Sequence, residues 1–256
     1  MSHQPNQPDQ LVQAPHIPLT NYYADEGQRR GWVQDIFNST AVDYDRIERL
    51  VGLGSGIWYR GAALQRAGLQ PGMRVLDIGV GTGLVACQAA AIVGRPALVT
   101  GIDPSPGMLE HAGVPEGVQL VRGVVERLPF ADASFAFLTM GYALRHIADL
   151  SLAFVECLRV LRPGGCYCIL EITCPQNKLH AWMLKAYMRG VVRWIAGLTA
   201  RSPRTPALWR YYWDTIAACV PPTQVMRTLE ATGFCQVERH VELGMFSEYR
   251  AHKPAA

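Results

Sequence analysis

The fold of this chain is indicated by residues 74–84, which read Arg74-Val-Leu-Asp77-Ile-Gly79-Val-Gly81-Thr-Gly83-Leu84. A short apolar run ends in an acid and then in glycines at alternate positions, and an Ala- and Val-rich helical pattern follows through Val93. A second apolar run, Ala97 to Ile102, ends on Asp103. The predicted order is strand, glycine-rich turn, helix, strand and acid, an arrangement that brings a turn and a ribose-binding acid to the carboxyl edge of a sheet.

The spacing of the glycines separates this turn from a dinucleotide fingerprint. That fingerprint reads G-x-G-x-x-G, whereas the glycines here read G-x-G-x-G and follow Asp77. A carboxylate beside the turn repels a pyrophosphate but suits a ligand that carries an ammonium group. Asp103 can accept hydrogen bonds from two ribose hydroxyls. S-adenosylmethionine, a nucleoside joined to an amino acid, fits both features; the alternative is a purely structural strand-to-helix turn.

Strand and helix patterns alternate along the rest of the chain. Helical patterns cover about Gln28–Asn38, Asp43–Val51, Ile57–Ala67, Leu150–Leu161 and Pro222–Thr232. Further strand patterns cover Val118–Arg122, Ser134–Met140, Cys166–Ile172, Cys235–Val241 and Met245–Ala251, the last two suited to an antiparallel hairpin. The fold class expected is α/β: a doubly wound, mainly parallel seven-stranded sheet of the Rossmann-like type, with N-terminal helices and a helical lid insertion.

Length and composition fit one domain of a soluble globular protein. The chain has 256 residues, of which 49% are hydrophobic and 18% charged, and no apolar run is long enough to span a membrane. The N-terminus is polar and rich in Gln and Pro without an apolar centre, so we expect residues 1–27 to be a flexible leader and not a signal peptide. Residues 28–252 are expected to form a single domain, with the lid at about 174–220. Seven cysteines without a C-x-x-C pair indicate a reduced, cytoplasmic protein, and no metal-ligand cluster is evident.

The lid segment has an unusual charge. From Ile172 to Trp213 it carries seven Lys or Arg and no Asp or Glu, leaving 17 basic and 21 acidic side chains elsewhere. Tryptophans and tyrosines are interleaved with the cations. Three interpretations stay open: a cap with a solvated basic stripe, a lid over a hydrophobic substrate with cations near an anionic or membrane-borne headgroup, and a single-strand nucleic-acid surface. The third is disfavoured because the rest of the chain is net acidic and shows no nucleic-acid module.

Further segments resemble a known family. They are Phe37-Asn-Ser-Thr-Ala-Val-Asp-Tyr-Asp45, Gly123-Val-Val-Glu-Arg-Leu-Pro-Phe130, Gly141-Tyr-Ala-Leu-Arg-His146 and Arg159-Val-Leu-Arg-Pro-Gly-Gly165. With the glycine-rich turn, which resembles motif I of the class I methyltransferases, they look like the ubiquinone/menaquinone-biosynthesis C-methyltransferase family, over about residues 30 to 250. The resemblance implies an S-adenosylmethionine-dependent methyltransferase.

The resemblance also implies positions for the ligands. The residues expected to bind S-adenosylmethionine are Asp77, Gly79, Gly81, Thr82, Gly83, Asp103, Val124, Val125 and Gly141. The chain departs from the family at Val124, where Asp or Asn is usual, so the adenine amino group loses a side-chain acceptor there. It departs again at His146, because the quinone-methylating members typically read Leu-Arg-Asn where this chain reads Leu144-Arg145-His146.

Methylation of a carbon on a phenol or quinol ring requires that a proton leave the hydroxyl. Arg145 and Tyr44 match family residues near this step, and His146 could take the proton itself, because imidazole titrates near neutral pH. Alternatively, His146 only replaces Asn as a hydrogen-bonding group. Trp182, Arg189 and Tyr212 of the lid are the expected substrate contacts.

Three functions are therefore considered. The first is C-methylation of a hydrophobic quinone-like or isoprenoid acceptor, and the second is O- or N-methylation of a specialised metabolite. The third is binding of S-adenosylmethionine without catalysis. The partners expected are a hydrophobic small molecule and, at the inner face of the membrane, a peripheral contact, but no nucleic acid; the acceptor's identity and the oligomeric state are left open.

Overall fold

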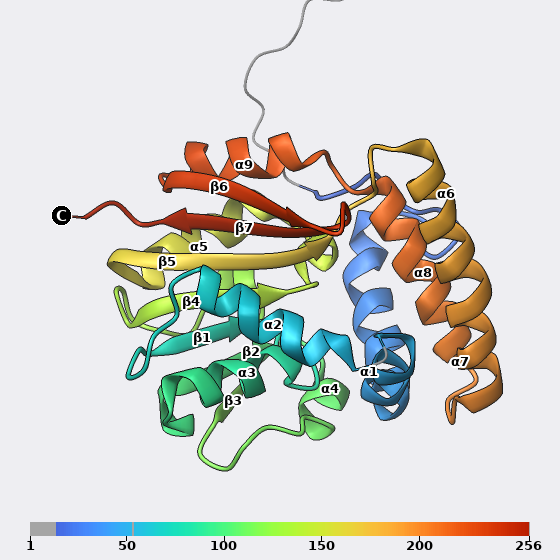
Figure 1. Ribbon diagram of the computed structural model, residues 1–256, viewed down its shortest axis with the longest axis horizontal. Coiled ribbons are helices and arrows are strands. Elements are labelled where there is room, and N and C mark those ends of the chain that lie inside the picture. Colours follow the sequence, from blue (N-terminus) through green and yellow to red (C-terminus); the bar gives the residue numbers. More distant parts are fainter. Residues whose placement is uncertain (1–13, 53, 256) are drawn as a thin grey trace, which may run out of the picture.

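A single sheet organises the molecule. The computed structural model describes residues 14–52 and 54–255, and within them seven strands pair in the order β3-β2-β1-β4-β5-β7-β6. The strands are β1 Val75–Ile78, β2 Val99–Asp103, β3 Gln119–Arg122, β4 Phe135–Gly141, β5 Leu161–Ile172, β6 Cys235–Glu242 and β7 Phe246–His252. β1 to β5 are parallel, and β7 runs antiparallel to both β5 and β6 (Figure 1). The strand order reverses between β1 and β4, and ligands bind at such a reversal in open α/β sheets.

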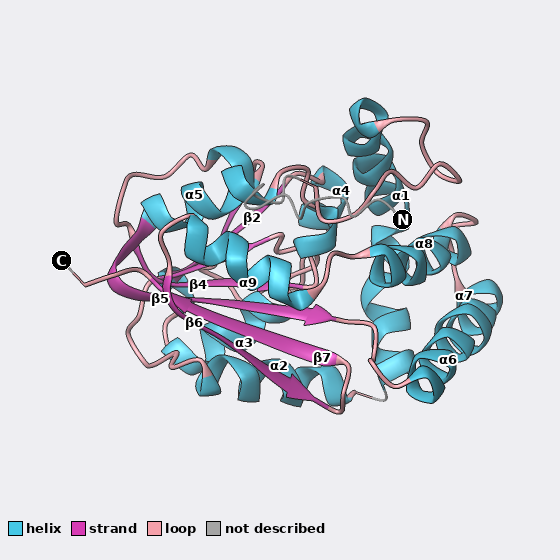
Figure 2. Ribbon diagram, turned by 90° about the horizontal axis from the view of Figure 1, so that it is seen from above, coloured by secondary structure: helices cyan, strands magenta, loops and turns pink. Residues whose placement is uncertain are grey.

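Helices cover both faces of the sheet, which confirms the predicted doubly wound fold. The α-helices of the described residues are α1 Glu26–Gly52, α2 Ser55–Arg66, α3 Leu84–Val93, α4 Pro106–Glu110, α5 Leu150–Val160, α6 Lys178–Ala186, α7 Arg193–Thr199, α8 Thr205–Ala218 and α9 Pro222–Ala231. Figure 2 shows α2 and α3 on one face of the sheet, with α5 and α9 on the other. The hairpin of β6 and β7 lies at the sheet edge, as predicted.

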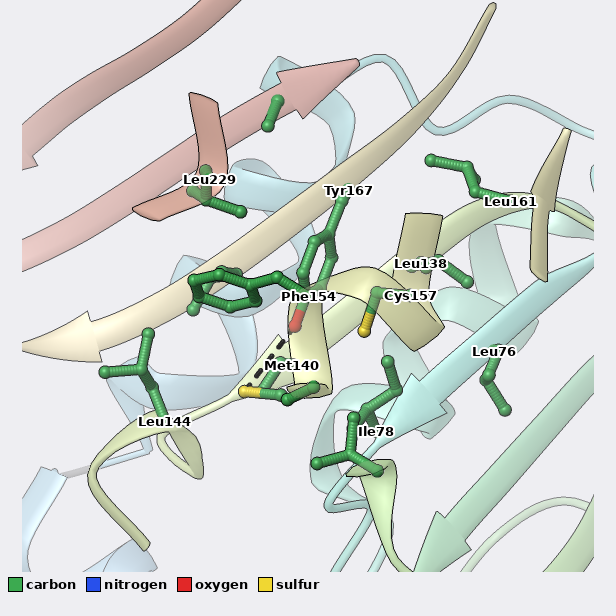
Figure 3. Packing of buried hydrophobic residues seen from close by; sticks show 14 of the residues in the cluster. Leu76, Ile78, Leu138, Met140, Leu144, Phe154, Cys157, Leu161, Tyr167 and Leu229 are labelled. Carbon is green, nitrogen blue, oxygen red and sulfur yellow. Dashed lines mark hydrogen bonds between the residues drawn. The ribbon is translucent and has the colours of Figure 1, made fainter. Parts of the chain in front are cut away.

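The larger core cluster lies between the sheet and helices α5 and α9. Phe154 of α5 and Tyr167 of β5 are fully buried at its centre, close to Met140 of β4 (Figure 3). The Tyr167 hydroxyl donates to the Met140 sulfur at 3.7 Å, so its polar atom is not left without a partner. Each large apolar side chain buried in this way contributes about 1.5–3 kcal/mol to folding, which fixes the strands whose ends carry the site.

Helix α1 differs from the prediction of two helices over its length. It runs without a break from Glu26 to Gly52, through the Ser39-Thr40 pair that separates the two predicted patterns. The Ser39 hydroxyl donates to the Asp35 carbonyl at 2.8 Å, and the Thr40 hydroxyl donates to the Ile36 carbonyl at 2.6 Å. Because both hydroxyls are satisfied within the helix, these residues do not end it.

The sequence predicts a flexible leader over residues 1–27, of which the structure describes residues 14–27. Residues 1–13 lie outside the described residues, but residues 14–25 pack on the body of the molecule. His16 and Tyr23 are buried, and the Val220 N–H donates to the Pro15 carbonyl at 2.7 Å. The Tyr22 hydroxyl donates to the Asp214 carboxylate at 2.6 Å, so this segment covers α8. Amino-acid composition did not reveal these contacts because they depend on a few individual residues.

The lid is helical, as predicted, and shares a core cluster with α1. A π-helical turn, Tyr187–Val192, joins α6 to α7. Leu184, Met188 and Val192 on the inner side of this helix pack with Trp209 and Tyr212 of α8. In Figure 1, α6 and α7 form the outer edge of the molecule, with α8 between them and α1.

Candidate active site

The glycine-rich turn lies at the carboxyl end of β1 and folds tightly against its neighbours. Gly79 and Gly83 adopt positive φ values of 66° and 92°. A Cβ on Gly79 would lie 2.6 Å from the Cβ of Ala143, in the loop after β4. A Cβ on Gly83 would lie 2.3 Å from a methyl group of Val114. Only glycine meets both requirements, so the turn can approach the β4 loop and leave its backbone open to a ligand.

Asp103 ends β2 beside this turn. One carboxylate oxygen accepts the Gly81 N–H at 2.9 Å, and the other accepts the Ser105 N–H at 2.8 Å. Burial raises the pKa of Asp103 to about 6, although the two hydrogen bonds partly offset this effect by lowering the pKa. Each oxygen keeps a lone pair for a further donor. Asp103 lines the cavity and can therefore hold two neighbouring hydroxyls of a ribose.

A cavity of about 200 Å³ joins the turn to the strand ends. Most of the residues predicted to bind the cofactor line it: Gly79, Gly81, Thr82, Asp103, Val124, Val125 and Gly141. Asp77 and Gly83 do not line it. Asp77 is buried behind the turn, where burial raises its pKa well above the usual value. The contact of Asp77 with the methionine part of the ligand stays a prediction.

Arg60 of α2 is a cavity residue that sequence reasoning missed. Its side chain is buried, and its Nη2 donates to the Glu48 carboxylate at 2.7 Å. Its Nε and Nη1 are buried without a hydrogen-bond partner among the described residues. A guanidinium with unused donors at a cavity wall suits a carboxylate ligand. The available signal was an arginine in the apolar first half of the predicted Ile57–Ala67 helix.

Glu126 is a second lining residue outside the predicted set. It follows Val124 and Val125, which form the expected adenine wall, and one of its oxygens accepts the Ala148 N–H at 3.1 Å. The same oxygen lies 3.6 Å from the Arg30 guanidinium. The cavity wall that includes Val124 thus carries a carboxylate two residues further along the chain.

Helix α1 brings the Phe37–Asp45 segment to the turn. The Thr82 hydroxyl donates to the Asp45 carboxylate, which ties α1 to the residues after β1. Phe37 and Tyr44 line the cavity from the same helix. The Tyr44 hydroxyl shares a hydrogen bond with the Tyr212 hydroxyl of the lid, and Tyr212 also lines the cavity. One end of the cavity is therefore aromatic and closed by α1 and α8.

His146 lines this aromatic end. Its ring lies 5.1 Å from the Phe37 ring, and its Nδ1 lies 3.4 Å from the Tyr211 hydroxyl. Its Nε2 is buried without a hydrogen-bond partner in the described part of the chain. Burial, and then the charges of Arg145 and Arg29, hold the pKa of His146 well below its usual value. Burial and these charges therefore favour the neutral imidazole.

Arg145 lies behind the cavity wall and does not line it. Its guanidinium is completely buried, forms an ion pair with the Glu171 carboxylate and donates to the Thr215 hydroxyl at 3.1 Å. It also lies over the Tyr212 ring, 4.4 Å from the centroid. Arg145 therefore reaches the cavity only through Tyr212 and the neighbouring His146, as a residue that positions them.

Two of the three predicted substrate contacts lie elsewhere. Tyr212 lines the cavity, but Trp182 and Arg189 do not. Trp182 is 65% exposed on the outer side of α6, and Arg189 donates to the Asp214 carboxylate at 2.6 Å on the surface. The sequence pattern could not separate the two sides of this helix because both are apolar.

Comparison with known proteins places this site in a family. The model of the ubiE/COQ5 methyltransferase family matches residues 24–253. The chain belongs to the ubiE/COQ5 methyltransferase family. It is 32% identical to a demethylmenaquinone methyltransferase of Mycobacterium sp. (strain KMS), over 87% of this chain and 94% of that one. It is 29% identical to the ubiquinone/menaquinone biosynthesis C-methyltransferase UbiE of Geotalea daltonii, over 86% and 96%.

Solved structures share the fold of this family member. A methyltransferase from Thermotoga maritima superposes with a TM-score of 0.60 at 22% identity, over 86% of this chain and 98% of that one. Phosphoethanolamine N-methyltransferase 2 of Haemonchus contortus, solved with S-adenosylmethionine, superposes with a TM-score of 0.55 at 20% identity, over 77% and 52%. At these identities the likeness concerns the fold alone.

The protein is an S-adenosylmethionine-dependent methyltransferase that acts on a hydrophobic small molecule, as the sequence predicted. The residues present fit this cofactor: Asp103 suits the ribose, and the unused donors of Arg60 suit the methionine carboxylate. When bound, the cofactor supplies an electrophilic methyl group. Within residues 14–52 and 54–255, no helix has the length and apolar character needed to cross a bilayer.

Proposed function

We propose that this enzyme methylates a ring carbon of a quinol precursor in quinone biosynthesis. The observation that carries the proposal is the aromatic end of the cavity, which Phe37, Tyr44 and Tyr212 line together with His146. Flat aromatic walls suit a planar ring. The names of the relatives, a demethylmenaquinone methyltransferase and a C-methyltransferase of ubiquinone/menaquinone biosynthesis, support a quinone-like acceptor.

In the proposed reaction His146 acts as the general base. Its neutral Nε2 takes the proton of a ring hydroxyl, which turns the phenol into a phenolate. The ring carbon beside it then forms a bond to the methyl group while the sulfur–methyl bond breaks and leaves a neutral thioether. The hydrogen on that ring carbon then leaves as a proton to solvent, and the imidazolium of His146 returns its proton to the ring oxygen, so the aromatic phenol is restored and one proton is released in total. Buried aromatic walls keep water away from the methyl group.

Other side chains position the reacting groups. The hydrogen bond between the Tyr44 and Tyr212 hydroxyls joins α1 to the lid above the acceptor. Arg145 holds the Tyr212 ring from behind, and its positive charge adds to the burial that lowers the pKa of His146. We propose that residues 28–252 work as one methyltransferase domain and that residues 174–220 act as its lid. We also place the enzyme in the cytoplasm, at the inner face of a membrane in which the acceptor dissolves.

The proposal is tested by transfer of a labelled methyl group. The purified protein is incubated with S-adenosylmethionine labelled with ¹³C on the methyl group and with reduced demethylmenaquinone carrying a short isoprenoid chain. A ¹³C resonance typical of a methyl group on a ring carbon is expected. A resonance typical of a methoxy group would show that an oxygen, not a ring carbon, is methylated. Absence of labelled product would contradict the acceptor class.

A further inference from the structure

The outer side of the lid helix exposes a continuous apolar stripe. Along residues 178–199, large apolar side chains recur at helical spacing on the side away from α8. They are Leu179 (62% exposed), Trp182 (65%), Met183 (54%), Trp194 (67%) and Leu198 (66%). Ala186, Gly190 and Gly197, also exposed, complete the stripe without interrupting it. Soluble surfaces rarely expose so contiguous an apolar patch unless it meets a partner.

Cations flank this stripe on one side. Lys178, Lys185, Arg189 and Arg193 each precede a position of the stripe by one residue, so on a helix they form a parallel row about 100° away. All four are exposed, and in the described part of the chain only Arg189 among them forms an ion pair. From Ile172 to Trp213 there is no acidic residue to compensate them.

We propose that this face of the lid, the stripe together with its basic row, docks on an anionic lipid bilayer. The apolar stripe would enter the boundary between headgroups and acyl chains, with α6 and α7 lying parallel to the membrane plane. Tryptophan favours that depth because its ring is apolar and its N–H is polar. Lys and Arg beside the stripe reach the phosphate groups, and such cations strengthen binding to anionic leaflets.

A bilayer explains this face better than a second copy of the chain. A twofold dimer through the stripe would bring two basic rows close together, and the segment offers no acid to separate them. An anionic lipid surface complements the same row. The rest of the chain carries 21 acidic against 17 basic side chains, so the lid is the side that such a surface attracts.

The position of this face also suits a lipid acceptor, and here the inference rests on the proposed function. The inner side of the same helix packs on Tyr212, and Tyr212 lines the cavity. A docked lid would therefore place the aromatic end of the cavity next to the membrane. The acceptor could pass from the bilayer to the site with little exposure to water.

Flotation of the full-length protein with lipid vesicles tests the docking face without acceptor or cofactor. Vesicles of phosphatidylcholine are compared with vesicles in which phosphatidylglycerol replaces part of it. We expect binding to the anionic vesicles that weakens with added salt, and little binding to the neutral ones. The double variant Trp182→Gln/Trp194→Gln should lose about tenfold or more in vesicle affinity, and Lys185→Gln/Arg193→Gln a similar factor.

Matched controls are available elsewhere on the surface. Trp58 on α2 is 72% exposed outside the lid, so Trp58→Gln makes the same chemical change there and should leave vesicle binding unchanged. Arg95→Gln/Arg227→Gln removes two exposed charges away from the lid. Equal loss in the control variants, or no binding of the wild type to anionic vesicles, would overturn the proposal.

Two further measurements separate this proposal from others. Concentration-dependent dimers that the tryptophan variant abolishes would assign the face to a second copy and overturn membrane docking. Calorimetry with S-adenosylhomocysteine should give the same affinity in every lid variant, because the stripe lies outside the cavity. If the protein transfers the methyl group but does not bind vesicles, the docking proposal fails and the proposed function stands. If it binds vesicles but does not methylate the quinol, the acceptor class is contradicted and the docking proposal stands.

Discussion

The guanidinium of Arg145 lies 4.4 Å from the centroid of the Tyr212 ring, and both side chains are buried. Tyr212 contacts the cavity, and its hydroxyl is hydrogen-bonded to Tyr44. Arg145 in turn is anchored by Glu171 of β5, and both side chains are almost completely buried. Glu171 of the sheet therefore supports the Tyr212 ring of the lid through its buried ion pair with Arg145.

This relationship predicts separable effects on stability and catalysis. Arg145→Met leaves the Glu171 carboxylate buried without its cation, which should lower the free energy of unfolding by about 3–5 kcal/mol. Arg145→Met/Glu171→Gln removes both charges and should recover most of that loss in urea denaturation. Its kcat should remain below wild type because Tyr212 has lost its support. Full recovery of kcat together with stability would show that the pair is only structural.

The same double variant should move a pH profile. The charge of Arg145 is one of the causes that lower the pKa of His146, after burial. Without that charge, the pKa of His146 should rise toward its usual value. The ascending limb of kcat/KM should therefore shift to higher pH than in the wild type, an effect that loss of packing alone does not produce.

Asp103 should couple pH to cofactor affinity. Its pKa of about 6 lies above the usual value, and protonation turns one of the two acceptor oxygens that face the ribose hydroxyls into a donor. S-adenosylhomocysteine should therefore bind more weakly as the pH falls below about 6. Asp103→Asn should weaken binding at neutral pH by about 1.5–3 kcal/mol and remove this pH dependence. Calorimetry across this pH range checks both effects, and pH-independent affinity in the wild type would contradict the ribose assignment.

Asp103→Asn should also stabilise the ligand-free protein at neutral pH. A carboxyl whose pKa is raised on folding binds more protons in the folded state between its two pKa values, so stability is lost as the pH rises through about 6. An amide has no charge to bury. The melting temperature at pH 7 should therefore rise in the variant while ligand affinity falls, and a lower melting temperature would contradict the destabilising role of the ionised carboxylate.

Arg60 should recognise the carboxylate of the cofactor. Arg60→Met should weaken S-adenosylhomocysteine by about 1.5–3 kcal/mol but should change the affinity for 5′-methylthioadenosine, which has no carboxylate, far less. Arg66→Met is the matched control because Arg66 lies on the same helix and pairs with Glu248 at 2.6 Å, outside the cavity. Equal losses for both ligands would show that Arg60 only supports the fold.

Sequence patterns predicted the sheet well because each strand end is marked locally. Apolar runs end in turn residues, and the Leu84–Val93 helix is found with its predicted bounds. The Ser39-Thr40 pair misled the prediction of α1 because hydroxyls inside a helix can bond to its own carbonyls. Whether the helix continues through these two residues depends on the packing around α1, which a local sequence pattern does not show.

The site was predictable where one local backbone motif sets the position of its residues. It was less predictable where side chains from distant segments meet. Gly79, Gly81 and Asp103 were found from spacing, since turn and acid are parts of one βαβ unit. Arg60 was missed because its place in the cavity wall depends on the packing of α2 beside the glycine-rich turn. The exposed position of Trp182 outside the cavity was not predictable, because a period of 3.6 does not identify the inner side of a helix when both sides are apolar.

The base is tested most directly at His146. His146→Ala should lower kcat by roughly 10²–10⁴, because the Nε2 that receives the hydroxyl proton is gone. Affinity for S-adenosylhomocysteine should stay near wild type, since the glycine turn and Asp103 are unchanged. His146→Asn should retain more activity than His146→Ala if a water held by the amide carries the proton. His240→Ala, at a half-exposed histidine on β6, is the control and should leave kcat unchanged.

The pH profile gives the mechanism an independent check. Burial and the neighbouring arginines hold the pKa of His146 well below its usual value, so the neutral base persists below pH 6.5 in the free enzyme. The ascending limb of kcat/KM should therefore lie at more acidic pH than the usual imidazole range, and His146→Asn should not show this limb. The same sign applies to folding: protonation favours the unfolded chain, so stability should fall as the pH drops below about 6.5, and less so in His146→Asn. Wild-type turnover in His146→Ala would instead show that this histidine only packs against Phe37, and that ring positioning by Tyr44 and Tyr212 carries the reaction.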